Sequence, residues 1–184
     1  IPVVDVTLPT SAEEIERGRY LANHVAVCMD CHSERNWDYF AGPIVPGTLG
    51  GGGEVFDRDS GLPGRLISKN ITPYALGSWS DGEIHRAITG GLQNDGDALF
   101  PLMPYDGYRN MDQRDVLAII AYLRTLAPIS NDVPDHVLDF PLNLIVNQVA
   151  PAIAVGCPVI VKPATATPLC CIEFVSLVRE AGLA

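Results

Sequence analysis

The segment Cys28-Met29-Asp30-Cys31-His32 decides how the rest of the sequence is interpreted. Two thiols separated by two residues can each add to a vinyl group of haem and form a thioether bond. The histidine that follows at once is then held where its imidazole can bind the iron. The segment therefore predicts a covalently attached haem c, with Cys28 and Cys31 as attachment sites and His32 as an axial ligand.

Two other kinds of site use cysteines at this spacing. A zinc ribbon needs a second pair of ligands, and no second pair follows at zinc-ribbon spacing. A redox dithiol usually opens a helix after a strand, whereas we expect this motif to lie at the end of the first helix. We therefore favour haem attachment over both alternatives.

The iron needs a second axial ligand or an open site, and the sequence offers several candidates. Met103 stands between Pro101 and Pro104, in a stretch that we expect to be rigid and extended. Such a stretch can hold a thioether against the iron, although filling a core gap is the common role of a methionine. Met111 is the reserve candidate, and Met29 lies inside the motif and cannot reach across the ring. Nothing in the sequence selects the remaining histidines as ligands: His24, His85 and His136.

The pair His32 and Met103 would leave the iron six-coordinate and suited to one-electron transfer, with the soft thioether favouring the reduced state. An open sixth position would suit peroxidase-like chemistry instead. A third alternative is a nicotinamide-binding or haem-free protein.

Three helices are predicted around the motif: about 12–27, 81–89 and 113–126. Ser11 and Ser80 each begin a capping box, and Asp112 is a helix cap. Residues 33–78 are predicted as loops, and we expect no strand in the first 135 residues. The run Gly50–Gly53 lacks the Lys-Ser/Thr of a phosphate-binding loop and is predicted as a flexible turn.

The charge of the chain is unevenly distributed. The 184 residues carry a formal net charge of −10, which argues against nucleic acids and anionic membrane surfaces as partners. Residues 1–148 hold 20 of the 22 acidic and 10 of the 12 basic residues, so residues 149–184 are neutral. No apolar run reaches the roughly 20 residues of a membrane span. The composition thus predicts two pieces, 1–148 and 149–184, with no membrane-spanning segment.

Residues 11–148 resemble a class I cytochrome c, in particular periplasmic cytochromes related to the cytochrome subunits of alcohol and sugar-acid dehydrogenases. The matching segments are 18–22 before the motif, 70–73, 79–84, 100–105 and 118–124. The resemblance implies a mainly α, class I cytochrome c fold with long loops around one haem, bound by Cys28, Cys31, His32 and Met103. It also implies that the first and third helices cross beside the haem. Further haem neighbours that it implies are Tyr20, Leu21, Tyr122 and Leu123, and, at the haem edge or propionates, Asn70, Trp79 and Tyr105.

The end of the chain, about 140–184, resembles a fragment of the cofactor-binding region of an aldehyde dehydrogenase. The expected order is helix, strand at Pro158–Lys162, and a helix that Thr167 caps and Gly182 ends. One strand cannot form a dinucleotide fold, so we expect no NAD binding. We interpret this α-β-α piece as a packing appendage, a disordered tail or the sign of a hybrid chain. Three cysteines there are expected to act as small core hydrophobes: Cys157, Cys170 and Cys171.

These observations predict an electron carrier or electron-transfer subunit rather than an enzyme. The expected partners are redox proteins, among them a dehydrogenase and a terminal oxidase or other cytochrome, with a basic docking patch. Covalent haem attachment implies a periplasmic or otherwise exported protein, and the absence of a signal peptide at Ile1 suggests a processed form. A hybrid or designed chain with no physiological function is the remaining alternative.

Overall fold

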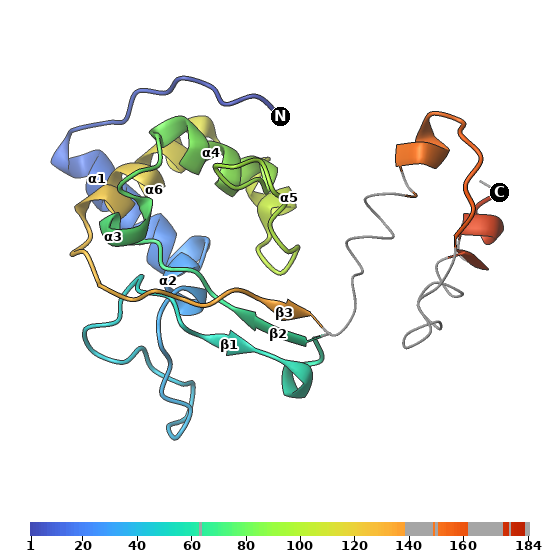
Figure 1. Ribbon diagram of the computed structural model, residues 1–184. Coiled ribbons are helices and arrows are strands. Elements are labelled where there is room, and N and C mark those ends of the chain that lie inside the picture. The colour runs from blue at the N-terminus through green and yellow to red at the C-terminus, as the bar shows by residue number, and fades with distance from the viewer. Residues whose placement is uncertain (63, 139–148, 150, 162–174, 177, 183–184) are drawn as a thin grey trace. The chain divides into compact units, whose positions relative to one another are not determined.

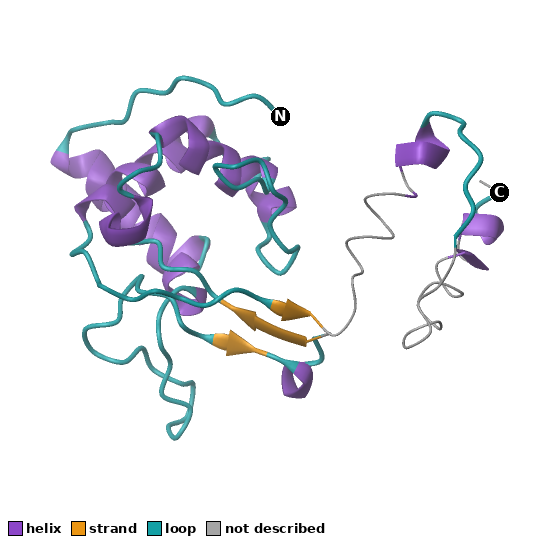
Figure 2. Ribbon diagram, viewed as in Figure 1, coloured by secondary structure: helices purple, strands orange, loops and turns teal. Residues whose placement is uncertain are grey.

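The chain is described from a computed structural model (Figure 1), which covers residues 1–62, 64–138, 149, 151–161, 175–176, 178–182. These residues fall into two compact units, described separately below. The first comprises Ile1–Val55 and Ile67–Asp135, and the second comprises Phe56–Leu66 and His136–Ala184. The described structure is rich in helices and has a small three-stranded sheet (Figure 2).

The first helix is shorter than predicted and ends in an irregular turn. Helix α1 spans Ala12–Tyr20, and the Ser11 hydroxyl accepts a hydrogen bond from the Glu14 amide at 3.3 Å. A π-helical turn, η1 (Leu21–Val25), follows, in which the Ala26 amide donates to the Leu21 carbonyl at 2.8 Å. Such widened turns have no simple sequence signal and are frequent at functional sites.

The Cys28 motif does not close the first helix, contrary to the prediction. Cys28–Cys31 forms a separate four-residue helix, α2, and Val27 before it adopts the left-handed conformation with φ 47°. A β-branched residue in this conformation stores about 1–3 kcal/mol of strain. The chain therefore turns sharply at Val27, which gives α2 its own direction.

The other two predicted helices are confirmed, and two short ones are new. Helix α4 (Asp81–Gly90) has the complete Ser80–Glu83 capping box and ends at Gly91, whose φ is 66°. Helix α6 (Gln113–Thr125) begins where the Asp112 carboxylate accepts from the Arg114 amide at 2.8 Å. The additional helices have four residues each, too few for hydrophobic periodicity to reveal: α3 (Pro73–Leu76) and α5 (Tyr105–Tyr108).

The expectation of no strand was wrong, because short strands are present. They are β1 (Val55–Phe56), β2 (Gly64–Ile67) and β3 (Val137–Leu138), in the sheet order β1-β2-β3, with a 3-10 turn, η2 (Arg58–Ser60), before β2. Strands β2 and β3 are antiparallel, with Gly64 opposite Leu138 and Arg65 opposite Val137. Strands of two to four residues leave too little alternation to be recognised in a sequence.

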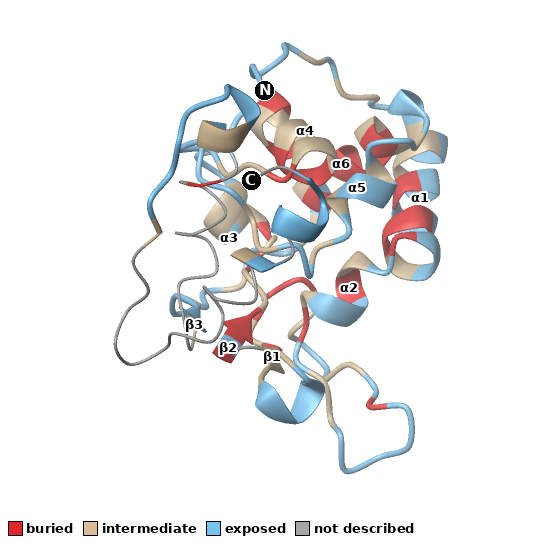
Figure 3. Ribbon diagram, turned by 90° about the vertical axis from the view of Figure 1, so that its right-hand side faces the viewer, coloured by how far each residue is buried: buried red, intermediate tan, exposed pale blue. Residues whose placement is uncertain are grey.

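The crossing of α1 and α6 forms the core of the first unit (Figure 3). Gly18 lies at the contact, where an added Cβ would sit 1.9 Å from the Ala118 carbonyl oxygen. Around it, α6 buries almost every apolar side chain, including Val116, Ile119 and Ile120. The Arg17 guanidinium pairs with the Asp115 carboxylate at 2.6 Å at the edge of the same contact. Glycine is thus required here by close backbone approach.

The end of the chain agrees with its prediction only in part. Residues 151–154, 175–176 and 178–180 are helical, and Gly182 has φ 71° after the last of them. The predicted strand is not formed at 158–161, because a strand needs a hydrogen-bonded neighbour. Cys157 is exposed rather than core-like, since nothing in the described structure covers it. Thr167, Cys170 and Cys171 lie outside the described residues.

Candidate haem site

The side chains of helix α2 differ in how far they are buried. The Met29 side chain is 1% exposed and anchors the helix in the core of the first unit. Cys28 is half-buried against the same core, whereas Cys31 is exposed. The His32 amide donates to the Cys28 carbonyl at 2.9 Å, which fixes the histidine directly after the last turn. The arrangement leaves both thiols free for a bond to a cofactor.

The His32 ring is oriented by a backbone carbonyl. Its Nδ1 lies 2.6 Å from the Lys69 carbonyl oxygen, which can only accept, so Nδ1 carries the proton. The lone pair is then on Nε2, for which the described residues provide no hydrogen-bond partner. Burial lowers the pKa of His32 and favours the neutral ring. A neutral imidazole with an oriented Nε2 is the form that binds a metal.

The glycine run holds this histidine and is not a flexible turn, contrary to the prediction. The Gly52 amide donates to the His32 carbonyl at 2.8 Å, and the Gly50 amide donates to the Ser33 hydroxyl at 3.1 Å. On its other side the run binds the Ser68–Ile71 segment, since the Gly53 amide donates to the Ser68 carbonyl at 2.9 Å. An added Cβ at Gly52, whose φ is 70°, would lie 2.6 Å from this backbone. The run is therefore an ordered layer between two backbone segments.

The chemistry of the two thiols does not suit a redox dithiol. Burial raises the pKa of Cys28 to about 11. Burial also raises the pKa of Cys31, and the neighbouring Asp30 carboxylate adds to the effect. Redox dithiols need a lowered pKa, because the thiolate is the nucleophile. Within the described ranges, no cluster of three or more His, Cys, Asp or Glu side chains suitable for a metal ion is present.

The two candidate methionines lie at either end of α5. Met103 and Met111 are both half-buried and pack against the same core as Cys28. The stretch around Met103 is a turn, not the extended segment predicted, because the Met103 amide donates to the Phe100 carbonyl at 3.2 Å. Pro104 then serves as the N-cap of α5. The proline pair fixes a turn here, so Met103 is still held in a restricted backbone.

Tyr108 connects α5 to the motif, a role that the sequence did not reveal. Its hydroxyl donates to the Ala26 carbonyl at 2.5 Å, two residues before Cys28. Burial, helped by the nearby Cys28 and Cys31 thiols, raises the pKa of Tyr108 to about 12. The phenol therefore stays protonated and remains a donor. The contact spans 82 residues of sequence, so no local pattern could have indicated it.

We expect Tyr108→Phe to destabilise the protein by about 1–3 kcal/mol, because a buried carbonyl loses its donor. The midpoint of thermal unfolding, followed by circular dichroism, should fall accordingly. Tyr39→Phe is the matched control, since Tyr39 is 65% exposed. An equal midpoint in both variants would show that the Ala26 contact contributes nothing.

The other side chains implied by the resemblance fall into two groups. Leu21, Tyr122 and Leu123 are buried in the core of the first unit. Tyr20 is 56% exposed, with its ring centroid 5.5 Å from that of His24. The Asn70 amide is fully used by the protein. It donates to the Ile129 and Asn131 carbonyls and accepts from Thr72. Trp79 and Tyr105 are half-buried.

The remaining histidines lie outside the motif. His24 is exposed in η1, and His136 is exposed in the second unit. His85 is half-buried on α4, and burial lowers its pKa.

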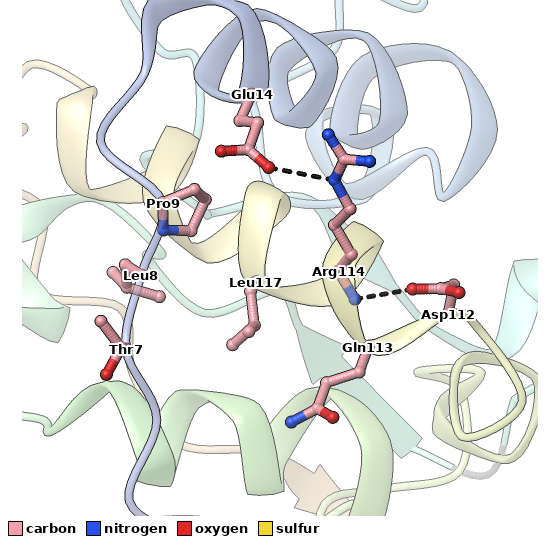
Figure 4. Close-up of a pocket in the computed structure, with 8 residues that line it drawn as sticks. All are labelled: Thr7, Leu8, Pro9, Glu14, Asp112, Gln113, Arg114 and Leu117. Atoms are coloured by element: carbon pink, nitrogen blue, oxygen red, sulfur yellow. Dashed lines mark hydrogen bonds and ion pairs between the residues drawn. The ribbon is translucent and has the colours of Figure 1, made fainter.

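A surface groove lies between residues 7–9 of the N-terminal segment and the starts of α1 and α6 (Figure 4). Across it the Arg114 guanidinium pairs with the Glu14 carboxylate at 3.0 Å. None of the motif residues lines this groove.

Comparison with known proteins separates the same two parts of the chain. Over 136 residues the chain is 33% identical to a nicotinate dehydrogenase subunit of Pseudomonas putida, covering 72% of the chain and 10% of that protein. Over 142 residues it is 32% identical to the fructose dehydrogenase cytochrome subunit of Gluconobacter japonicus, a match that covers 74% of the chain and 26% of that subunit. The larger part of the chain is similar to cytochrome c subunits of dehydrogenases.

The last part of this cytochrome-like chain matches a different family. The model of the aldehyde dehydrogenase family matches residues 138–184. An aldehyde dehydrogenase of Enchytraeus buchholzi is 50% identical over 44 residues, 24% of the chain and 9% of that protein. Both resemblances expected from the sequence are thus confirmed. The chain spans about a quarter or less of the two dehydrogenase-subunit relatives named above. In the described part of the chain, no helix has the length and apolar character to span a membrane.

The residues of the first unit fit a haem. Among the described residues, the oriented Nε2 of His32 has no hydrogen-bond partner, and the Cys28 and Cys31 thiols in the preceding helical turn form no disulfide. Half-buried apolar side chains from several loops pack against the adjoining core, among them Ile44, Leu49, Ile71 and Met103. Such side chains retain apolar surface that a flat macrocycle could cover.

Proposed function

We propose that this protein transfers single electrons through one covalently bound haem c. Cys28 and Cys31 would carry the thioether bonds, His32 would be the proximal ligand, and Met103 would be the distal ligand. The observation that carries the proposal is the His32 ring, whose Nδ1 donates to the Lys69 carbonyl at 2.6 Å beside the two free thiols. One C-x-x-C-H segment in the chain corresponds to one haem.

When bound, the haem supplies the change between ferric and ferrous iron. The chain's own residues hold and tune it. The Lys69 carbonyl keeps the proton on Nδ1, so Nε2 would be the atom that binds the iron. The Gly52 amide holds the His32 backbone. The turn before α5 would hold the Met103 thioether as a ligand, and its softness would raise the reduction potential.

We further propose that the chain works beside a dehydrogenase, because its relatives are cytochrome subunits of dehydrogenases. Electrons would then pass on to a terminal oxidase or another cytochrome. We also propose a periplasmic or otherwise exported location, which covalent haem attachment by a C-x-x-C-H segment implies. The role proposed is electron transfer, not catalysis by this chain.

The remaining proposal concerns the end of the chain. We assign residues 1–148 to the cytochrome part and 149–184 to an aldehyde-dehydrogenase-like fragment that is not an independent domain. A dinucleotide site needs several parallel strands, and residues 158–161 form none. The fragment is therefore not assigned a nicotinamide site.

The test of covalent attachment uses the full chain expressed with a haem-attachment system. We expect the wild-type haem to stay with the protein in acidified organic solvent and to give a c-type pyridine haemochrome spectrum. The double variant Cys28→Ala/Cys31→Ala should lose all covalent haem, because no thioether can form. Cys157→Ala is the control and should keep a full complement, since that thiol is exposed and lies outside the motif. Extraction of the wild-type haem would rule out the proposal.

A further inference from the structure

A closed surface loop follows directly after the motif. We call residues 34–45 the aromatic loop. Its base is closed by two backbone hydrogen bonds, from the Val45 amide to the Glu34 carbonyl and from the Asn36 amide to the Pro43 carbonyl, both 2.9 Å. An isolated bridge pairs Arg35 with Ile44 between them. In Figure 1 the loop is drawn in light blue and projects away from α2, and Figure 3 shows most of it exposed.

Three large aromatic side chains are exposed on the aromatic loop. Trp37 is 66% exposed, Tyr39 65% and Phe40 102%. The Trp37 ring is nevertheless fixed in place. Its Nε1 donates to the Glu54 carboxylate at 2.6 Å, and the Arg35 guanidinium lies 5.2 Å from the ring centroid. An exposed aromatic side chain that is already held rigid loses little entropy on binding.

The charge at the surface of the loop is negative. Glu34 and Asp38 are exposed, and the Asp30 side chain is 48% exposed. Arg35 is the single basic residue between Cys28 and Glu54 apart from the motif histidine, and its side chain is only 15% exposed. Its guanidinium pairs with Asp30 at 3.1 Å and donates to two loop carbonyls, so it is directed inward. The loop therefore offers acidic groups around an apolar patch.

The aromatic loop lies beside the exposed attachment site. Asp30, which Arg35 binds, immediately precedes Cys31 in α2. The Arg35 guanidinium also donates to the Asp30 carbonyl at 3.3 Å, so the base of the loop is bonded to the residue next to Cys31. A haem bonded through Cys31 would be attached at an exposed position of the chain. Electron transfer between proteins favours contact at such a position.

We propose that the aromatic loop is the docking surface for a redox protein that presents basic side chains around an apolar patch. This inference rests on the proposed function and names the kind of partner that would exchange electrons at the same site. The acidic groups would steer the encounter, and the aromatic side chains would fill the centre of the interface. Acidic groups disfavour an anionic membrane surface, so a protein is the occupant that the charge selects.

The test measures binding to a basic probe by titration calorimetry at low ionic strength. The probes are mitochondrial cytochrome c, a small basic redox protein, and the same protein with acetylated lysines. We expect the haem-loaded full chain to bind the first and not the second. Tyr39→Ser/Phe40→Ser and Glu34→Lys/Asp38→Lys should each weaken binding by at least about 10-fold, the effect of losing interface anchors or complementary charge.

The control Asp5→Lys/Glu13→Lys makes the same change in net charge at exposed positions outside the loop. It should weaken binding by roughly 3-fold or less, because distant surface charges are screened. Equal losses in control and loop variants would overturn the proposal, as would unchanged affinity in the loop variants. The proposal would also be overturned if the wild-type chain bound phosphatidylcholine vesicles, or formed a dimer in sedimentation, and the loop variants did not. Covalent haem content is measured first, so a failure of the proposed function is seen separately as missing haem.

Discussion

Met103→Ala is expected to keep its covalent haem but to lose the weak far-red band that a sulfur–iron bond gives in the oxidised protein. The variant should bind cyanide rapidly, because removal of the thioether opens the sixth position. Its reduction potential should fall by on the order of 0.1 V, a part of the roughly 0.8 V range that axial ligands span. Absorption spectra and a redox titration of the full chain measure all three effects.

Met111→Ala is the matched control for this experiment. Both methionines are half-buried, pack against the same core and flank α5, so both variants lose a similar contact. Only the substitution that removes the iron ligand should change the spectrum and the reduction potential. Loss of the band in Met111→Ala alone would transfer the ligand role to Met111. A wild-type protein that lacks the band and binds cyanide at once would instead favour the peroxidase-like alternative.

The parts of the structure that were predictable are those fixed by local chemistry. The helix caps place hydroxyl and carboxylate oxygens within three residues of the amides that they satisfy, so Ser80 and Asp112 marked the starts of α4 and α6. The C-x-x-C-H segment likewise holds the proposed attachment sites and the proposed proximal ligand within five successive residues. Because the residues of each pattern lie close together in the sequence, the helix caps and the C-x-x-C-H segment can be recognised without a structure.

The unpredicted parts depend on contacts between distant segments. The carbonyl that orients His32 belongs to Lys69, 37 residues away, and any residue type supplies a carbonyl. The sharp turn at Val27 has φ 47°, a conformation that valine itself disfavours and the packing of α2 must impose. The run Gly50–Gly53 is typical of flexible loops, yet its missing side chains let two backbone segments meet. Composition alone could not distinguish these roles.

Gly18→Ala is expected to destabilise the protein by at least about 2 kcal/mol, in the upper part of the range for overpacked cores. The added Cβ would lie 1.9 Å from the Ala118 carbonyl oxygen and 2.4 Å from its carbon. Both atoms are backbone, so no side-chain rotation can relieve the overlap. Helices α1 and α6 would have to separate. Thermal unfolding of the haem-loaded chain, followed by circular dichroism, measures the loss.

Gly107→Ala separates this steric effect from helix propensity. Gly107 also lies in a helix, α5, but an added Cβ there meets nothing within 4 Å. Alanine is favoured over glycine inside helices by about 0.5–1 kcal/mol, so the control should be neutral or slightly stabilised. The same substitution should therefore act in opposite directions at the two positions. A Gly18→Ala midpoint equal to that of the control would mean that the helix crossing tolerates a wider spacing, and close approach would not explain glycine there.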